Sequence, residues 1–184
     1  VSTNPSCGKR CGFRIENMIK SFLKYSLIIS GIILLFISCE RDDICPATTA
    51  TTPFLIVQFF DVSEPEINKA VQGLSYVAEN SIDTISLGNT DSIALPLNTN
   101  QNITQFQLIR NTNNSSFRNV DTVRFIYEVD EVYVNRACGF KAVFRNLSAI
   151  RTAENPISNN WIRSVSTEQL NVINEQNTHV FILH

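Results

Sequence analysis

The sequence predicts an all-β fold, an antiparallel β-sandwich of Ig-like architecture that follows an N-terminal targeting segment. Two observations predict the sandwich. Eight or nine short apolar or alternating segments recur between turn-forming Asn, Ser and Pro residues, and no alternation of helices with strands indicates a parallel sheet. The targeting segment is indicated by a basic flank, a short apolar run and a small residue before Cys39.

The first strand is expected at residues 54–60, a nearly continuous apolar run that only Gln58 interrupts. Its aromatic and branched residues favour a buried strand, because the run is too short for a confident helix. Regular alternation of Phe106 and Leu108 with Gln residues places one face of a later strand in the core. Further strands are expected at 74–78, 83–87, 91–97 and 104–110.

The second half of the chain continues with strands. Residues 123–129 alternate cleanly, and Asp130-Glu131 breaks the phase before residues 132–134, which predicts a turn or bulge there. Further on, Cys138, Phe140, Ala142 and Phe144 share one face, expected to be the core face, with Lys141, Val143 and Arg145 opposite. An Asn/Ser-rich hairpin loop is expected at 111–119, and the last strands at 161–166 and 178–183. Trp161 follows both Cys45 and Cys138, so the Ig order of cysteine, tryptophan, cysteine is absent.

The targeting segment has the order of a secretory signal. Lys20 and Lys24 precede an apolar run over 27–37, and Ser38 and Cys39 follow this run. This run has about a dozen residues, whereas a membrane-spanning helix needs about 20. A permanent transmembrane helix is therefore the weaker alternative, and it would leave the C-terminal domain on the same side of the membrane.

The end of this segment resembles the lipobox of bacterial lipoproteins, with Phe36 in the place where leucine is usual. The resemblance implies that Cys39 becomes the first residue of the mature protein and carries fatty-acyl chains such as palmitate. More than one chain gives stable anchoring. The expected organisation is an upstream extension at 1–17, a signal peptide at 18–38, a lipidated tether at 39–52 and a β-sandwich domain at 53–184.

Charge and cysteine content indicate which ligands and cross-links can be expected in this protein. Residues 39–184 contain ten basic and sixteen acidic residues, a formal charge of −6, which disfavours nucleic-acid binding. Cys7 and Cys11 have no matching pair at zinc-ligand spacing. Cys45 and Cys138 remain in an oxidising compartment, where a disulfide is expected; two separate thiols are the alternative.

The sequence contains no strong catalytic, cofactor or metal motif, so neither a catalytic site nor a cofactor is expected. His179 and His184 would lie on opposite faces of one strand, which disfavours a metal pair. Glu128 and Asp130 share a face and could serve a hydrolase, although a solvated strand end is the simpler interpretation. Trp161 is a possible ligand contact that could stack on a sugar, with core packing as the alternative.

Four segments together resemble an uncharacterised family of Bacteroidota lipoproteins of unknown function: 39–46 (CERDDICP), 52–56 (TPFLI), 95–98 (LPLN) and 136–140 (RACGF). The resemblance implies a lipid anchor and a small β-rich domain, without an activity. Glu40, Arg41, Asp42 and Asp43 resemble the acidic signal that exports such lipoproteins to the cell surface.

Three hypotheses for function follow. The first is a non-enzymatic outer-membrane lipoprotein, on the cell-surface or periplasmic face, that is held to the membrane by its lipid and has an envelope protein or glycan as partner. The second is a glycan- or peptide-binding module at the cell surface, and the third is a hydrolase that uses Glu128 or Asp130.

Overall fold

The computed structural model of the protein describes residues 20–31, 44–153 and 159–184. The chain divides into two units, Val1–Ile44 and Cys45–His184. In the first unit, residues 20–31 form a helix. Within the described ranges, no helix is both long enough and apolar enough to cross a membrane. Cys39 and the charged residues at 40–43 lie outside the described residues.

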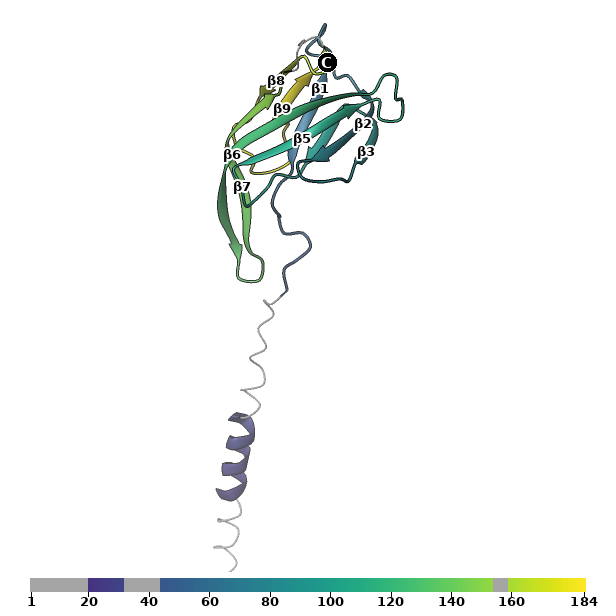
Figure 1. Cartoon of the computed structure of the whole chain (residues 1–184). Coiled ribbons are helices and arrows are strands. Elements are labelled where there is room, and N and C mark those ends of the chain that lie inside the picture. Colours follow the sequence, from purple (N-terminus) through teal and green to yellow (C-terminus); the bar gives the residue numbers. More distant parts are fainter. Residues whose placement is uncertain (1–19, 32–43, 154–158) are drawn as a thin grey trace, which may run out of the picture. The chain divides into compact units, whose positions relative to one another are not determined.

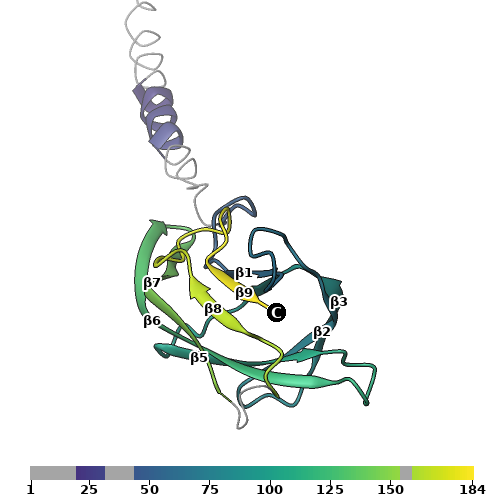
Figure 2. The same ribbon diagram turned by 90° about the horizontal axis from the view of Figure 1, so that it is seen from above.

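The second unit is a two-layered sandwich of strands (Figures 1 and 2), which confirms the all-β sandwich that the sequence predicts. The smaller sheet has the order β4 (Ser92–Leu95), β1 (Leu55–Phe60), β9 (Val180–Leu183) and β8 (Ser164–Thr167). The larger sheet has the order β3 (Ile85–Thr90), β2 (Val71–Ala78), β5 (Ile103–Arg110), β6 (Asn119–Asn135) and β7 (Gly139–Arg151).

The core lies between the two sheets and draws its side chains from both. On β6, Val123, Phe125 and Tyr127 are all buried, in agreement with the predicted alternation. Facing them, the alternating residues Leu55, Val57 and Phe59 of β1 are fully buried. Apolar side chains at every second position of both layers therefore exclude water from the space between the sheets, and this burial is the main stabilising contribution.

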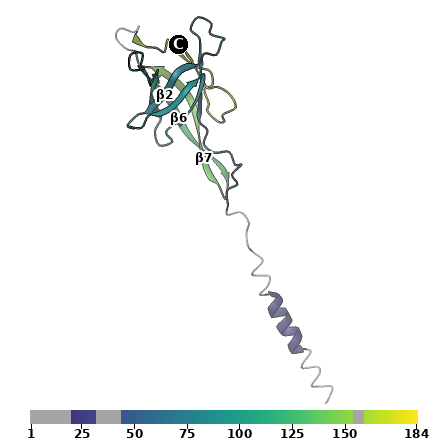
Figure 3. The same cartoon turned by 90° about the vertical axis from the view of Figure 1, so that its right-hand side faces the viewer.

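Strands β6 and β7 pair far beyond the region in which the two sheets face each other. The register runs from Val123↔Arg151 to Asn135↔Gly139, and Figures 1 and 3 show the distal part of this hairpin extending past the other strands. We call residues 129–145 the hairpin arm. The turn or bulge predicted at Asp130-Glu131 is wrong, because both residues pair regularly with β7. The register shifts lie instead between Ile126 and Glu128, where β7 has an extra residue next to Asn146, whose φ is +53°, and between Tyr133 and Asn135, close to the turn.

The other end of the chain completes the smaller sheet. Strand β9 pairs with β1 in parallel, whereas the other strand pairs among the described residues are antiparallel. His179 precedes β9 and is 2% exposed. Its Nδ1 accepts a hydrogen bond from the backbone N–H of Ile56 at 3.0 Å, and its backbone N–H donates to the Ile56 carbonyl at 2.9 Å. His179 therefore fixes the parallel pair at the point where it begins.

His184 is also buried, at the end of β9. Its ring meets those of Phe59 and Trp161 edge to face, with centroids 6.1 and 5.7 Å away, and its Nε2 lies 3.1 Å from the Lys69 carbonyl oxygen. Burial is the main cause that lowers the pKa of His179 and the pKa of His184 below the ordinary value of 6.5. Both histidines are therefore structural residues of the core, and they are neutral at pH 7.

We expect the free energy of unfolding to fall as the pH falls from 7.5 to 5. Below pH 6.5 the unfolded chain binds protons at both histidines, while the folded chain resists protonation because burial has lowered their pKa values. Stability is therefore fully present above the unfolded pKa and is lost as the pH falls toward the lowered folded pKa. Urea unfolding at several pH values measures this slope.

The double variant His179→Gln, His184→Gln tests the assignment. We expect it to be less stable at pH 7.5, because the Ile56 N–H and the ring contacts lose their partners, but its stability should vary little between pH 7.5 and 5. A variant that keeps the full wild-type slope would contradict the role of these two residues.

Candidate functional site

The start of the sandwich domain is tied to the end of the hairpin arm. A disulfide joins Cys45 to Cys138, with their Cα atoms 4.8 Å apart, and this is the pairing that the sequence predicts. Cys138 lies in the turn between β6 and β7, where its backbone N–H donates to Asn135 Oδ1 at 2.8 Å. Gly139 follows with a φ of +68°, a backbone conformation that favours glycine. The turn thus presents Cys138 to the N-terminal segment.

Two threonines of the N-terminal segment add further contacts with the arm. Thr52 Oγ1 accepts a hydrogen bond from the Ala142 N–H at 3.0 Å, and the Thr49 hydroxyl lies 3.6 Å from the Cys138 sulfur. Residues 45–52 therefore run along the arm as a braced segment. A hollow of about 390 Å³ remains between them and the end of the arm. Its lining includes Cys45, Pro46, Thr52, Val134 and Phe140.

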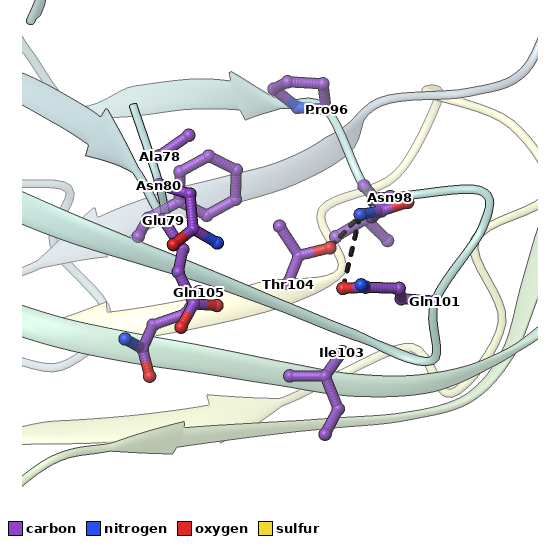
Figure 4. A pocket seen from close by; sticks show the side chains of 11 residues that line it. Ala78, Glu79, Asn80, Pro96, Asn98, Gln101, Ile103, Thr104 and Gln105 are labelled. Atoms are coloured by element: carbon purple, nitrogen blue, oxygen red, sulfur yellow. Dashed lines mark hydrogen bonds between the residues drawn. The ribbon is translucent and has the colours of Figure 1, made fainter. Parts of the chain in front are cut away.

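A second pocket, of about 280 Å³, lies where β2 ends and β5 begins (Figure 4). We call it the amide pocket, because four side-chain amides line it together with one carboxylate and several apolar groups. In Figure 4, Asn80, Glu79 and Gln105 lie on one side, and Asn98, Gln101 and Thr104 on the other. The lining residues are Ala78, Glu79, Asn80, Pro96, Leu97, Asn98, Gln101, Ile103, Thr104, Gln105 and Phe106.

Hydrogen bonds hold the loop that forms one wall of the amide pocket. The backbone N–H of Asn98 donates to Thr104 Oγ1 at 2.9 Å, and its side chain donates to Gln101 Oε1 at 3.5 Å. The Tyr127 hydroxyl donates to the Asn98 carbonyl at 2.9 Å and also bonds Thr104. Burial raises the pKa of Tyr127 above its ordinary value of 10, so the hydroxyl keeps its proton for this bond.

The chemistry of the amide pocket suits recognition rather than reaction. Side-chain amides offer both donors and acceptors, and the apolar side chains of Ile103 and Pro96 offer a surface for nonpolar ligand faces. Glu79 is the only ionisable residue in the lining, and a single carboxylate has no acid–base partner there. No residue of this pocket was predicted from the sequence as a site. The amide-rich stretch at residues 98–102 (NTNQN), between two predicted strands, is the signal that could have found it.

The structure places Trp161 inside the sandwich. Its side chain is 2% exposed, and its Nε1–H donates to the Leu108 carbonyl at 3.2 Å. The guanidinium of Arg110 lies 5.9 Å from the ring centroid, at cation–π distance. A buried ring cannot stack on a sugar, so the core interpretation of Trp161 holds in this structure, and its interpretation as a ligand contact is wrong.

The carboxylates proposed for a hydrolase lie on the outside of the β6–β7 hairpin. Glu128 accepts a hydrogen bond from Asn146 Nδ2 at 3.0 Å, and Asp130 forms an ion pair with Arg145 at 2.9 Å. Neither residue lines the amide pocket or the hollow beside the disulfide. Among the described residues, no cluster of three or more His, Cys, Asp or Glu side chains could hold a metal ion. The geometry thus gives no support to hydrolysis at Glu128 or Asp130.

Comparison with known proteins gives one match. Residues 70–184 match the model of a family described as a family of unknown function, DUF6452. The match begins just before β2 and contains Cys138 and Trp161, whereas Cys45 precedes it. Neither the curated proteins nor the solved structures contain a match to this chain. Because the matched segment is more than half of the chain, the protein belongs to the DUF6452 family.

Proposed function

We propose that the protein is a Bacteroidota-type lipoprotein, anchored in the outer membrane through acyl chains on Cys39, and that it acts as a non-enzymatic interaction or accessory module. The observation that carries the proposal is the disulfide between Cys45 and Cys138. Disulfides persist outside the cytoplasm, where a secretory signal would deliver the domain. The signal-like order of residues 20–39 and the charged residues at 40–43 also support the anchor and its export.

The disulfide limits how far the domain can lie from the proposed lipid anchor. Cys45 lies six positions after Cys39, a stretch that spans at most about 20 Å when extended. The disulfide at Cys45 thus leaves only a short tether between Cys39 and the domain. Acyl chains on Cys39 would therefore hold the domain near the membrane surface. Such an arrangement suits a protein that presents a fixed surface to an envelope partner. No described cluster of side chains suggests a reaction that would add an enzymatic role.

The anchor predicts that Cys39 carries the lipid. When the full chain is expressed in a host that processes lipoproteins, in the presence of an alkyne-labelled fatty acid, the mature protein should take up the label and begin at Cys39. The variant Cys39→Ser should lose the label completely and leave the membrane fraction, because the acyl chains supply the membrane affinity. Mass spectrometry of the N-terminal peptide makes the assignment.

Cys45→Ser is the matched control, since it removes the cysteine six positions after Cys39 and breaks the disulfide. It should keep the label, although the domain should lose about 2–4 kcal/mol of stability. An uncleaved, unmodified N-terminus in wild-type envelopes would overturn the anchor. Recovery of the acylated protein in mild detergent without a stoichiometric envelope partner would contradict the interaction role.

The amide pocket favours a second candidate function, the binding of a neutral glycan or a short peptide. Its volume of about 280 Å³ is near the lower end of the range for small-molecule sites, and its amides are suited to hydroxyl or peptide groups. Trp161 would not contact a ligand in the amide pocket, because its side chain is buried in the core and does not line the pocket.

We expect a neutral oligosaccharide or short peptide that fits the pocket to raise the melting temperature. A ligand at a hundredfold excess over its Kd adds about 2.7 kcal/mol to the folded state. Gln101→Ala removes an amide from the pocket wall and should abolish most of the shift, whereas Gln107→Ala, on β5 but outside the pocket, should preserve it. A screen of both ligand classes without a shift, or an equal loss in both variants, would rule out the pocket.

A further inference from the structure

The far end of the hairpin arm exposes an aromatic pair. Tyr133 and Phe140 are 58% and 65% exposed, and their rings meet edge to face with centroids 5.4 Å apart. They lie directly opposite each other in the register. By strand alternation they continue the face that carries Ala142 and Phe144, which are buried at the base of the arm. The expectation that Phe140 lies in the core is wrong, because its side chain is 65% exposed near the turn of the hairpin arm, whose far end extends past the other strands (Figure 1).

This exposure is built into the structure, because the end of the arm is held from both sides. Ladder pairing continues to Asn135↔Gly139, and the disulfide fixes the turn to residue 45. The Thr52–Ala142 hydrogen bond secures the strand beside Phe140. Clustered exposed apolar side chains on a well-ordered element mark a contact surface, since their exposure to water is unfavourable.

The charge of this end differs from that of the rest of the domain. Residues 132–141, which we call the arm tip, contain Arg136 and Lys141 and no acidic residue. The adjoining residues 45–52 carry no charged side chain. Two acids precede the tip: Glu131 adjoins it directly, and Asp130 is paired with Arg145. The tip is thus aromatic and basic in a unit, Cys45–His184, whose nine basic and thirteen acidic residues give a formal charge of −4.

We propose that the arm tip is a second membrane contact, in which Tyr133 and Phe140 enter the interfacial region of the bilayer and Arg136 and Lys141 approach anionic headgroups. Aromatic rings and basic side chains are the residues that favour this interface. The inference rests on the proposed anchor at Cys39. The tether and the disulfide together keep the Cys138 turn within about 25 Å of an acylated Cys39, so the bilayer lies within reach of the tip.

The lipid surface fits the tip better than a second copy of the chain. The covalent path from the anchor leads straight to the tip through Cys45 and Cys138. The other end of β6 lies roughly 45 Å away along the strand and has an exposed aromatic of its own, Phe117, at 68% exposure. If exposed aromatic residues caused copies of the chain to associate, both Phe117 and the arm tip would take part. The proposed anchor, in contrast, brings only the arm tip to the membrane.

Tryptophan scanning in vesicles tests the proposal. The full-length acylated protein is reconstituted in phosphatidylethanolamine–phosphatidylglycerol vesicles, with or without brominated acyl chains. Phe140→Trp and Tyr133→Trp replace exposed rings and should fold, and Phe117→Trp is the matched control. Trp161 contributes a constant background because it is buried. Brominated lipid should quench the added emission about twofold at both tip positions and leave the added emission of Phe117→Trp unchanged.

Each result decides between alternatives. If mass spectrometry finds no acyl chain on Cys39, both the anchor and the membrane contact are overturned. If Cys39 is acylated but the tip tryptophans are no more quenched than the control, the anchor stands and the membrane contact is overturned. A blue shift of the tip emission that depends on protein density and not on brominated lipid would assign the tip to an interface between copies, which also overturns the proposal.

Discussion

The disulfide between Cys45 and Cys138 is the constraint on which the functional end of the molecule depends. It joins residues 93 positions apart in the sequence and ties the start of the sandwich domain to the hairpin arm. Closure of so long a loop restricts the unfolded chain, and bridges of this kind contribute about 2–4 kcal/mol. Without it, β6 and β7 would still pair within the arm, but the segment at 45–52 would depend mainly on Thr49 and Thr52 for its contacts with the arm. The exposed tip would then lose its fixed relation to the start of the domain.

The core strands were predictable because their burial has a local signature. Alternation in residues 123–129 places every second side chain between the sheets, and the structure buries Val123, Phe125 and Tyr127. The same rule failed at Asp130-Glu131 for a physical reason. Residues 130–133 of β6 are all exposed, so acidic side chains are tolerated there within a continuous ladder, even though Val143 and Ala142, their partners on β7, are buried. The break in apolar alternation marks where the buried face of β6 ends and not where the strand ends.

The polar anchors of the core could not be predicted, because their partners are distant in the chain. Asp121 is 1% exposed, and its carboxylate accepts hydrogen bonds from Asn160 Nδ2 at 3.0 Å and from the Ile162 N–H at 2.7 Å. His179 likewise fixes β1 from a position 123 residues later. Trp161 follows directly after Asn160 and donates to the Leu108 carbonyl. These bonds explain why the last part of the chain closes the sandwich, and why a tryptophan that follows two Asn residues is buried.

The amide pocket and the arm tip are connected through a single strand, and this connection relates the two candidate roles. Tyr127, whose hydroxyl holds the pocket loop at Asn98, precedes Tyr133 of the tip by six residues on β6. At about 3.3 Å per residue the two tyrosines are roughly 20 Å apart along the strand. With the tip at a bilayer, the arm would act as a spacer that sets how far the pocket can stand from the membrane. Because β6 runs without a break from the pocket to the tip, a ligand or partner at the pocket would be held at a fixed height above the lipid, which a tether alone could not achieve.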